Sequence, residues 1–407
     1  MSYVLVILLL FVAVEGVLRW AVRGARAKFG WLITEKDELP RFPPDVLDKF
    51  FLKSYSKELG WVKRPYSFGY DEAQGIRTKY TIGERGDRNV PEAKGKVSRV
   101  ASFGDSYVFC RQVDDCETWQ NELSTKSEVG VLNYGVGNYG ADQALLRYKM
   151  TNLPAEVDVV ILGFVPETIC RINSYYKHYS EFGNILAFKP KFVMKERGLR
   201  LLDNPINCRA DFNNIERVLE KVKPEDYFYF RKFRKYQFRG IYLLSMMRAP
   251  IRNTLLLALV GASCLPFLSE AKRSFFLGQA FKVVMRGNVR ISHRMYENDE
   301  DQLLIEIVKE LKREAMRRGH RPVVLMVPQL LDLKLKGAKQ PYRRFVQKIK
   351  SEVLVVDAAD EMLLAMGKGR SMYINDVFGG HLNAEGNRLV SRLLYSKVMT
   401  HFYFKTG

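Results

Sequence analysis

The chain has 407 residues, which is enough for two or three domains or for one domain with a large insertion. Hydrophobic residues make up 47% and aromatic residues 12%, a composition that excludes a disordered chain and allows a sizeable core. The 65 basic against 45 acidic residues give a net charge of +20, which favours anionic partners: phospholipid headgroups, acidic polysaccharide or nucleic acid.

Five cysteines are scattered along the chain without the paired spacing of a zinc site, so we expect no bound metal. Cys110 and Cys116 are near enough in sequence to close a small disulfide loop in an oxidising compartment. Free buried thiols are the alternative.

Residues 1–22 predict a membrane anchor. Residues 3–14 are uninterrupted apolar sequence, and continuing to Val22 reaches the roughly 20 residues that a spanning helix needs. Glu15 and Arg19 are four apart, in the order that favours an ion pair on one helical face. A cleaved signal peptide is the alternative, although a basic n-region and a small-residue cleavage site are both missing. The basic residues that follow favour a cytoplasmic flank: Arg19, Arg23, Arg26 and Lys28.

Residues 23–95 form a mixed N-terminal extension, in which prolines break any long helix. From there, strand-like apolar runs alternate with amphipathic helical segments in two stretches, 96–207 and 298–407. We expect strands within 97–103, 129–135, 157–164, 321–328 and 351–360, and helices within 117–126, 141–150, 299–320 and 384–399. Strands that alternate with helices predict an α/β fold with a mainly parallel sheet covered on both faces.

Residues 208–297 separate the two stretches and have a different pattern. The segment is helical in periodicity, basic and aromatic, and 254–268 is apolar but is shorter than a membrane span and contains Pro266. We predict an inserted helical cap with an apolar underside. Contact of this cap with lipid headgroups is one interpretation of its composition. The alternative is a solvated basic face over a local core. We expect no nucleic-acid partner, because no nucleic-acid-binding module accompanies the segment.

The first candidate site is Gly104-Asp105-Ser106, which ends the strand-like run 97–103. It is either an ordinary strand-to-loop turn or a turn that presents Ser106 as a nucleophile. A serine nucleophile needs a base, a group that orients the base and donors for the oxyanion. Among five histidines, His381 stands out, because an acid precedes it, glycines flank it and a helical segment follows it. A structural loop histidine is the alternative reading.

Three blocks together resemble the SGNH/GDSL hydrolase family in order and spacing: "ASFGDSY", "VLNYGVGNYGADQALLRY" and "NDVFGGHLNAEGNRLV". The resemblance covers most of 97–205 and 299–395 and is particularly close to membrane-anchored bacterial members with Gly-Gly-His-Leu-Asn near the C-terminus. It implies a three-layer α/β/α, flavodoxin-like sheet with an N-terminal transmembrane helix and a helical insertion. It also implies a periplasmic or extracytoplasmic catalytic domain, against the charge pattern after the anchor.

The resemblance assigns Ser106 as the nucleophile and His381 as the general base. The family's orienting acid usually stands three residues before the histidine, where this chain has Phe378. Asp376, five residues before, is therefore the candidate acid. A Ser-His dyad is the fallback, and Asp357 at the end of a predicted strand is the outside candidate.

For the oxyanion hole, the resemblance implies the backbone N–H of Ser106, a second-block N–H at Asn138 beside Gly137, and a third-block position at Thr168. The family has an asparagine at that third position. A threonine hydroxyl is a shorter donor, and losing one oxyanion donor typically costs about 10²–10³ in rate. We therefore expect reduced activity, another donor such as Asn173, or no activity.

The implied function is a membrane-anchored serine ester hydrolase or O-acyltransferase that needs no cofactor and acts on O-acetyl groups of a surface or extracellular polysaccharide. One alternative is a catalytically weak scaffold that binds polysaccharide or biosynthetic partners. Another is a protein that acts on lipid esters at the membrane surface through the insertion.

Overall fold

The computed structural model describes residues 3–73, 75–196, 198–374 and 380–402. The chain divides into two compact units, which are described separately. The helical unit comprises Met1–Pro44, Ser174–Ala187 and Ala210–Asn288, and the sheet unit comprises Asp45–Asn173, Phe188–Arg209 and Val289–Gly407. Most of the predicted insertion 208–297 thus lies in the helical unit, which also takes in residues 174–187.

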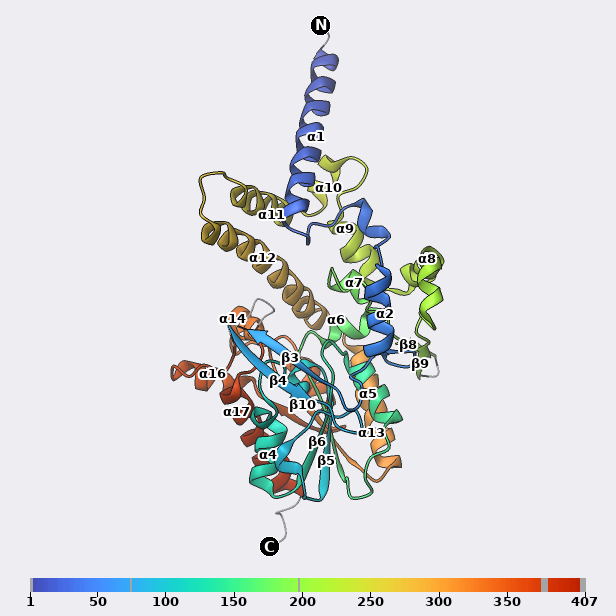
Figure 1. Ribbon diagram of the computed structural model, residues 1–407, viewed down its shortest axis with the longest axis vertical. Coiled ribbons are helices and arrows are strands. Elements are labelled where there is room, and N and C mark those ends of the chain that lie inside the picture. The colour runs from blue at the N-terminus through green and yellow to red at the C-terminus, as the bar shows by residue number, and fades with distance from the viewer. Residues whose placement is uncertain (1–2, 74, 197, 375–379, 403–407) are drawn as a thin grey trace. The chain divides into compact units, whose positions relative to one another are not determined.

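A five-stranded parallel sheet forms the centre of the sheet unit (Figure 1). Its strands lie in the order β11-β10-β7-β5-β6 and have these bounds: β5 (Ser98–Gly104), β6 (Gly130–Gly135), β7 (Val159–Phe164), β10 (Arg321–Met326) and β11 (Leu354–Asp357). This is the flavodoxin-like order of a doubly wound fold, in which the direction of winding switches between β5 and β7. The predicted α/β class with a mainly parallel sheet is confirmed.

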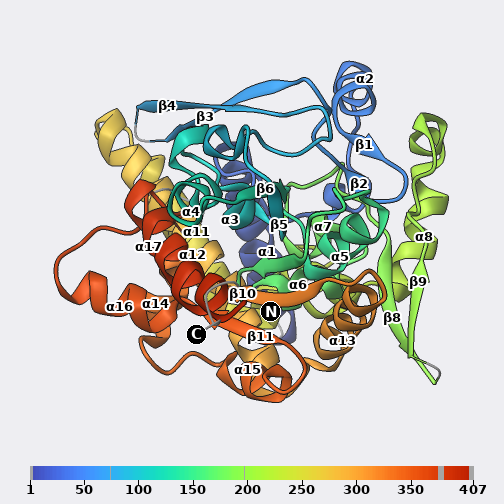
Figure 2. The same ribbon diagram turned by 90° about the horizontal axis from the view of Figure 1, so that it is seen from below.

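Helices cover both faces of the sheet (Figure 2). One face carries α4 (Trp119–Ser127), α16 (Ala359–Gly367) and α17 (Ala384–Leu394), and the other carries α5 (Ala141–Met150) and α13 (Gln302–Arg317). Alternate residues of each strand serve the two faces. Val100 and Ile161 pack with Trp119 and Met362 in one apolar cluster, and all of these side chains are buried.

Shorter elements complete the sheet unit. Its antiparallel pairs are β1 (Tyr55–Ser56) with β2 (Gly60–Trp61), β3 (Phe68–Ala73) with β4 (Ile76–Thr81), and β8 (Lys191–Lys195) with β9 (Gly198–Leu202). Its remaining helices are α2 (Pro44–Lys53), α3 (Ser106–Phe109), α6 (Thr168–Asn173), α14 (Leu330–Lys336), α15 (Arg343–Ile349) and α18 (Thr400–Phe402).

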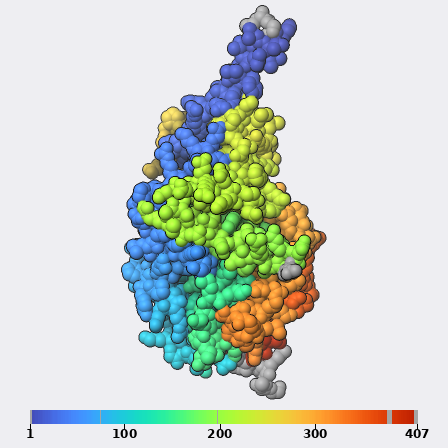
Figure 3. All heavy atoms as spheres, turned by 90° about the vertical axis from the view of Figure 1, so that its right-hand side faces the viewer, coloured from blue at the N-terminus to red at the C-terminus, as the bar shows by residue number. Residues whose placement is uncertain are grey.

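The helical unit is built around the C-terminal half of α1 (Tyr3–Lys28). Its other helices are α7 (Lys177–Ser180), α8 (Ile215–Glu225), α9 (Arg234–Tyr236), α10 (Tyr242–Arg248), α11 (Pro250–Ser263) and α12 (Glu270–Glu297), whose last residues belong to the sheet unit. Val22 of α1 packs in one core with Leu256 and Val260 of α11. The N-terminal part of α1 stands clear of the rest of this unit in the space-filling view (Figure 3).

Within the described residues, α1 is the one helix that is by itself long and apolar enough to cross a membrane, which fits the predicted anchor. It continues beyond the predicted end at residue 22, to Lys28. The predicted ion pair is present, since Arg19 Nε lies 2.8 Å from Glu15 Oε1.

Candidate active site

A row of glycines places Ser106 at the carboxyl end of the sheet. Gly104 of β5 pairs with Gly135 of β6 and with Gly163 of β7. A Cβ on Gly104 would lie 2.0 Å from the Gly163 carbonyl oxygen, and one on Gly135 would lie 2.2 Å from the Phe109 backbone nitrogen. The row therefore lets the short helix α3, which begins at Ser106, lie directly against the three strand ends.

Asp105 fixes the turn between β5 and α3. Its Oδ1 accepts the backbone N–H of Tyr107 at 2.9 Å, so it is the N-cap of α3. Its Oδ2 accepts the backbone N–H of Val165 at 3.0 Å and an N–H of Arg171 Nη1 at 3.2 Å. Burial raises the pKa of the Asp105 carboxyl, while the Arg171 guanidinium and the two backbone N–H groups hold that pKa down. Asp105 therefore shapes the turn that carries Ser106.

Arg171 joins three loops at the strand ends. Besides Asp105, its Nη1 donates to the carbonyl oxygen of Tyr139 at 3.1 Å, in the loop after β6. Its Nη2 donates to Glu167 Oε2 at 2.9 Å, beside its own helix α6. Arg171 was not among the site residues predicted from the sequence. Its one local signal is a basic residue inside the otherwise apolar start of a helix.

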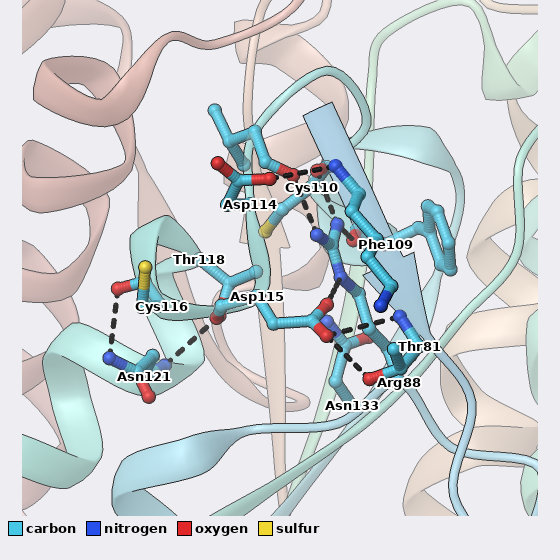
Figure 4. A network of polar contacts seen from close by, with 12 residues as sticks. Thr81, Arg88, Phe109, Cys110, Asp114, Asp115, Cys116, Thr118, Asn121 and Asn133 are labelled. Carbon is cyan, nitrogen blue, oxygen red and sulfur yellow. Dashed lines mark hydrogen bonds and ion pairs between the residues drawn. The ribbon is translucent and has the colours of Figure 1, made fainter. Parts of the chain in front are cut away.

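Arg88 holds the other end of α3 (Figure 4). That helix ends at Phe109 and is capped by Cys110, whose φ of 59° lies in the left-handed region. The buried Arg88 guanidinium donates to the carbonyl oxygens of Phe109 at 2.7 Å and Cys110 at 2.6 Å, and its Nε lies 2.8 Å from Asp115 Oδ1. Arg88 comes from the N-terminal extension, for which the sequence predicted only that prolines break any long helix.

Ser106 and His381 lie next to each other. The Ser106 Oγ is 3.1 Å from His381 Nε2, across a sequence separation of 275 residues. The Tyr107 hydroxyl donates to the Gly380 carbonyl oxygen at 2.5 Å, and the Tyr107 ring centroid lies 5.2 Å from that of His381. Tyr107 thus ties α3, which begins at Ser106, to the segment that carries His381. Ser106 is 6% exposed and His381 is 7% exposed, so the pair is held in a largely dry setting.

The candidate orienting acid, Asp376, lies outside the described residues. The outside candidate, Asp357, has other contacts, since its Oδ1 accepts the Tyr342 hydroxyl at 2.9 Å and the Ala359 backbone N–H at 3.0 Å. Burial raises the pKa of the Asp357 carboxyl.

The candidate oxyanion donors come from three places: Ser106 begins α3, Gly137 and Asn138 lie between β6 and α5, and Thr168 begins α6. The backbone N–H groups of Ser106, Gly137 and Asn138 have no hydrogen-bond acceptor among the residues that the structure describes. Asn138 takes a left-handed φ of 69°. Thr168 is fully buried, and its hydroxyl oxygen accepts the Ala141 backbone N–H at 2.8 Å, at the start of α5. Asn173, the substitute donor, gives its side-chain N–H to the Ile169 carbonyl oxygen at 2.9 Å.

All five cysteines are free thiols, with Cys110 buried and Cys116 exposed. Burial raises the pKa of the Cys110 thiol to about 12, so this neighbour of α3 stays protonated. Across the described part of the chain, no group of three or more His, Cys, Asp or Glu side chains is arranged to hold a metal ion.

Among the comparisons with known proteins, the comparison with solved structures is the one that finds similar chains. No family model matches the chain, and no curated protein matches it. One similar structure is described as a candidate lipolytic protein of the G-D-S-L family from Desulfitobacterium hafniense DCB-2. It is 10% identical with a TM-score of 0.31, over 74% of this chain and 99% of that one. A second is 12% identical with a TM-score of 0.34, over 75% of this chain and 97% of the other. The fold class therefore rests on the topology of the sheet, and a function has to rest on the geometry of the site.

Proposed function

We propose that this chain is a membrane-anchored serine ester hydrolase or O-acyltransferase, with Ser106 as the nucleophile and His381 as the general base. The observation that carries the proposal is the 3.1 Å contact between Ser106 Oγ and His381 Nε2. A serine hydroxyl is a weak nucleophile by itself and becomes effective when a base within hydrogen-bonding distance takes its proton. Ser106 follows β5, beside the point between β5 and β7 where the direction of winding switches, and this is where such folds bind their ligands.

The reaction proceeds in two halves. His381 Nε2 takes the hydroxyl proton as Ser106 Oγ attacks the ester carbonyl carbon. The carbonyl oxygen becomes an oxyanion that accepts hydrogen bonds from the backbone N–H groups of Ser106 and of the Gly137–Asn138 turn. The intermediate collapses, the C–O bond to the alcohol breaks, and His381 returns the proton to that alcohol. A water molecule or a sugar hydroxyl then attacks the acyl-serine with His381 again as the base, which releases the acid or the new ester.

Asp376 is the proposed partner for the second ring nitrogen of His381, where a carboxylate would fix the tautomer and stabilise the imidazolium. The proposed substrate is an O-acetylated polysaccharide outside the cytoplasm. The excess of 20 positive charges supports this choice, because a basic protein attracts an acidic glycan. The anchor α1 would keep the sheet unit near the membrane surface, where such polymers are exported or displayed.

The test uses the full chain in detergent micelles, with a fluorophosphonate probe and p-nitrophenyl acetate as substrate. Ser106→Ala abolishes covalent labelling, and His381→Ala abolishes turnover. Ser127→Ala is the matched control, because Ser127 is also 6% exposed and lies in α4, where its hydroxyl only donates to the Leu123 carbonyl oxygen. Labelling that persists in Ser106→Ala contradicts the proposal. Acetate release compared with acetyl transfer to added oligosaccharide then separates hydrolase from transferase.

A second candidate is a catalytically weak scaffold that binds polysaccharide. It is favoured by Thr168, which stands at the position of the usual asparagine and uses its hydroxyl oxygen at the start of α5. This function predicts a folded chain that the probe does not label. It also predicts that Ser106→Ala binds an acetylated acidic polysaccharide as tightly as the unmodified protein does.

A further inference from the structure

Glu15 is the one acidic residue of α1, and it attaches the start of α10 to that helix. Its Oε1 accepts the backbone N–H of Tyr242 at 2.8 Å, and its Oε2 accepts the backbone N–H of Leu243 at 2.9 Å. Arg19 completes the junction. Its Nη2 donates to the Gly240 carbonyl oxygen, and its guanidinium lies 4.5 Å from the centroid of the Tyr242 ring. The carboxylate thus satisfies the free N–H groups that begin a helix.

The position of Glu15 along α1 gives the depth of this junction. An α-helix rises 1.5 Å per residue, so residues 3–22 extend over about 30 Å, the thickness of the hydrocarbon core. Glu15 is seven residues before Val22 and therefore lies about 10 Å inside the boundary of the core. The first turn of α10 lies at the same depth, because Glu15 binds it directly. Unpaired backbone N–H groups are costly there, and Glu15 provides their acceptors.

The break between α10 and α11 is also satisfied internally. The two helices meet at a bend of 114°, and together they are apolar enough to pass as one broken membrane segment. The buried Asn253 donates from Nδ2 to the Ser245 carbonyl oxygen at 3.1 Å, and Pro250 at the start of α11 has no N–H to satisfy. The polar backbone groups at this bend are therefore satisfied without water. Non-helical backbone at membrane depth has to meet this condition.

The outer side of the two helices is apolar and exposed. Met247 is 75% exposed and Ile251 is 78% exposed, and further exposed apolar side chains lie around them: Ile241, Leu244, Leu255, Leu265 and Phe267. Among residues 241–268, all of which the structure describes, Arg248 is the one exposed charged residue. Exposed apolar side chains that recur along one segment, rather than singly, mark a protein or membrane interaction site.

Charge and aromatic residues mark where this surface would meet the headgroups. Trp20 is exposed on α1, two residues before the end of the predicted span, which is a position typical of interfacial tryptophan. Exposed basic residues come soon after the predicted span on α1 and soon after the apolar segment 241–268. They are Arg23 and Lys28 in the first case, and Lys272 and Arg273 in the second. Anionic phospholipid headgroups match these charges.

We propose that α10 and α11 form a re-entrant hairpin that enters the same leaflet of an anionic phospholipid bilayer as the C-terminal half of α1, with Glu15 as its fixed attachment. The hairpin surface, defined as the exposed apolar residues of 241–268, lies against acyl chains and is continuous with the lipid-exposed surface of α1. This goes beyond contact of the insertion with headgroups. It rests on α1 as an anchor and is independent of the ester chemistry at Ser106.

The test measures depth in vesicles of phosphatidylethanolamine and phosphatidylglycerol. The full chain, with Cys116, Cys208 and Cys264 changed to Ser, receives one new cysteine that carries an environment-sensitive fluorophore. Met247→Cys and Ile251→Cys report on the hairpin surface, and Val12→Cys reports on the anchor. Glu220→Cys is the control, because Glu220 is exposed on α8 of the same unit.

The proposal predicts blue-shifted emission at positions 247 and 251, quenching by spin-labelled acyl chains and protection from iodide, all as at position 12. Position 220 shows the reverse. Iodide access at 247 and 251 equal to that at 220 overturns the proposal. Protection from iodide without quenching by spin-labelled lipid also overturns it, because the surface is then covered by protein, such as a second copy of the chain. Ester turnover is measured on the same samples. It tests the proposed chemistry at Ser106, whereas the fluorescence tests the hairpin, so that failure of one proposal is distinguished from failure of the other.

Glu15→Ala tests the attachment. The change makes α1 more apolar, so the signal at position 12 stays the same, whereas positions 247 and 251 lose their quenching. Glu15→Gln keeps one acceptor oxygen and therefore retains part of the quenching at positions 247 and 251. Quenching that Glu15→Ala leaves unchanged at 247 and 251 contradicts the assigned role of Glu15.

Discussion

Arg171→Met removes the counter-charge of the Asp105 carboxylate, which fixes the turn that carries Ser106. The Asp105 side chain has no exposed surface, and that of Arg171 is 9% exposed. Breaking a buried pair by deleting one partner costs about 3–5 kcal/mol, because the remaining charge stays buried and uncompensated. The methionine side chain preserves most of the packing. We therefore expect a loss of about 3–5 kcal/mol in the unfolding free energy of the sheet unit.

The control is Arg99→Met, which breaks the pair between Arg99 and Asp158. Those side chains are 42% and 21% exposed, so the expected loss is about 0–1 kcal/mol. Adding Asp105→Asn to Arg171→Met removes the uncompensated charge and recovers part of the loss. A double-mutant cycle over these two positions then gives the coupling between them.

The loss in Arg171→Met also depends on pH. Burial raises the pKa of the Asp105 carboxyl above its ordinary value, and removing Arg171 raises that pKa further. A carboxyl whose pKa is higher in the folded than in the unfolded state favours folding at low pH, and this contribution is lost as the pH rises through the folded pKa. The difference in unfolding free energy between Arg171→Met and the unmodified protein should therefore narrow as the pH is lowered.

The assay is hydrogen–deuterium exchange of residues 98–110 in the full chain in detergent micelles, over a urea series. It reports on β5 and α3 without assuming that the two units unfold together. The assigned role of the Asp105–Arg171 pair is refuted if Arg171→Met lowers the unfolding free energy no more than Arg99→Met does. It is also refuted if adding Asp105→Asn restores none of that free energy.

Three further predictions concern packing, pH and thiol reactivity. Gly135→Ala should lower the unfolding free energy of the sheet unit, measured in urea, by about 1–3 kcal/mol, because the added Cβ would lie 2.2 Å from the Phe109 backbone nitrogen. Gly278→Ala in α12 should leave the unfolding free energy unchanged, because its added Cβ would meet nothing within 4 Å. Burial lowers the pKa of His178 from 6.5 to about 3, so between pH 6.5 and 5 the unfolded chain binds a proton that the folded chain does not. Acidification over this range should therefore lower the unfolding free energy of the helical unit by about 2 kcal/mol. His178→Phe, which keeps ring contacts with Tyr176 and Phe182, should flatten that loss in thermal melts, and an unchanged slope would refute the assignment. Iodoacetamide should label the exposed Cys116 and Cys208 at pH 8 and leave Cys110 unmodified, because the buried Cys110 thiol has a pKa of about 12; rapid labelling of Cys110 in the folded chain would contradict this.

Local pattern was enough to place the sheet and the helices that cover it. The apolar run 157–164 predicted a buried strand, which the structure shows as β7 (Val159–Phe164), and the periodicity of 299–320 predicted α13 (Gln302–Arg317). These elements could be predicted because side-chain period and β-branching are properties of neighbours in the chain. Gly104, which follows the strand-like run 97–103, was visible too, but its pairing with Gly135 and Gly163 was not.

The pairing of Ser106 with His381 was expected from three sequence blocks and their resemblance to a family. The 3.1 Å contact depends on the sheet, which brings together two loops 275 residues apart. No local pattern measures that distance. Asp376 lies outside the described residues, so its role stays a prediction.

Tertiary structure alone decided which charged residues support the site and how the helical unit is composed. Arg88 lies in the mixed N-terminal extension, and Arg171 lies in a short helix. Both guanidinium groups are nevertheless buried against carbonyl oxygens and carboxylates from other parts of the chain. Glu15 was assigned its partner Arg19 four residues away, while its bonds to Tyr242 and Leu243 cross more than half the chain. Sequence determines periodicity, because periodicity is local. Whether a charge is solvated or buried against a distant partner depends on which surfaces the folded chain brings together.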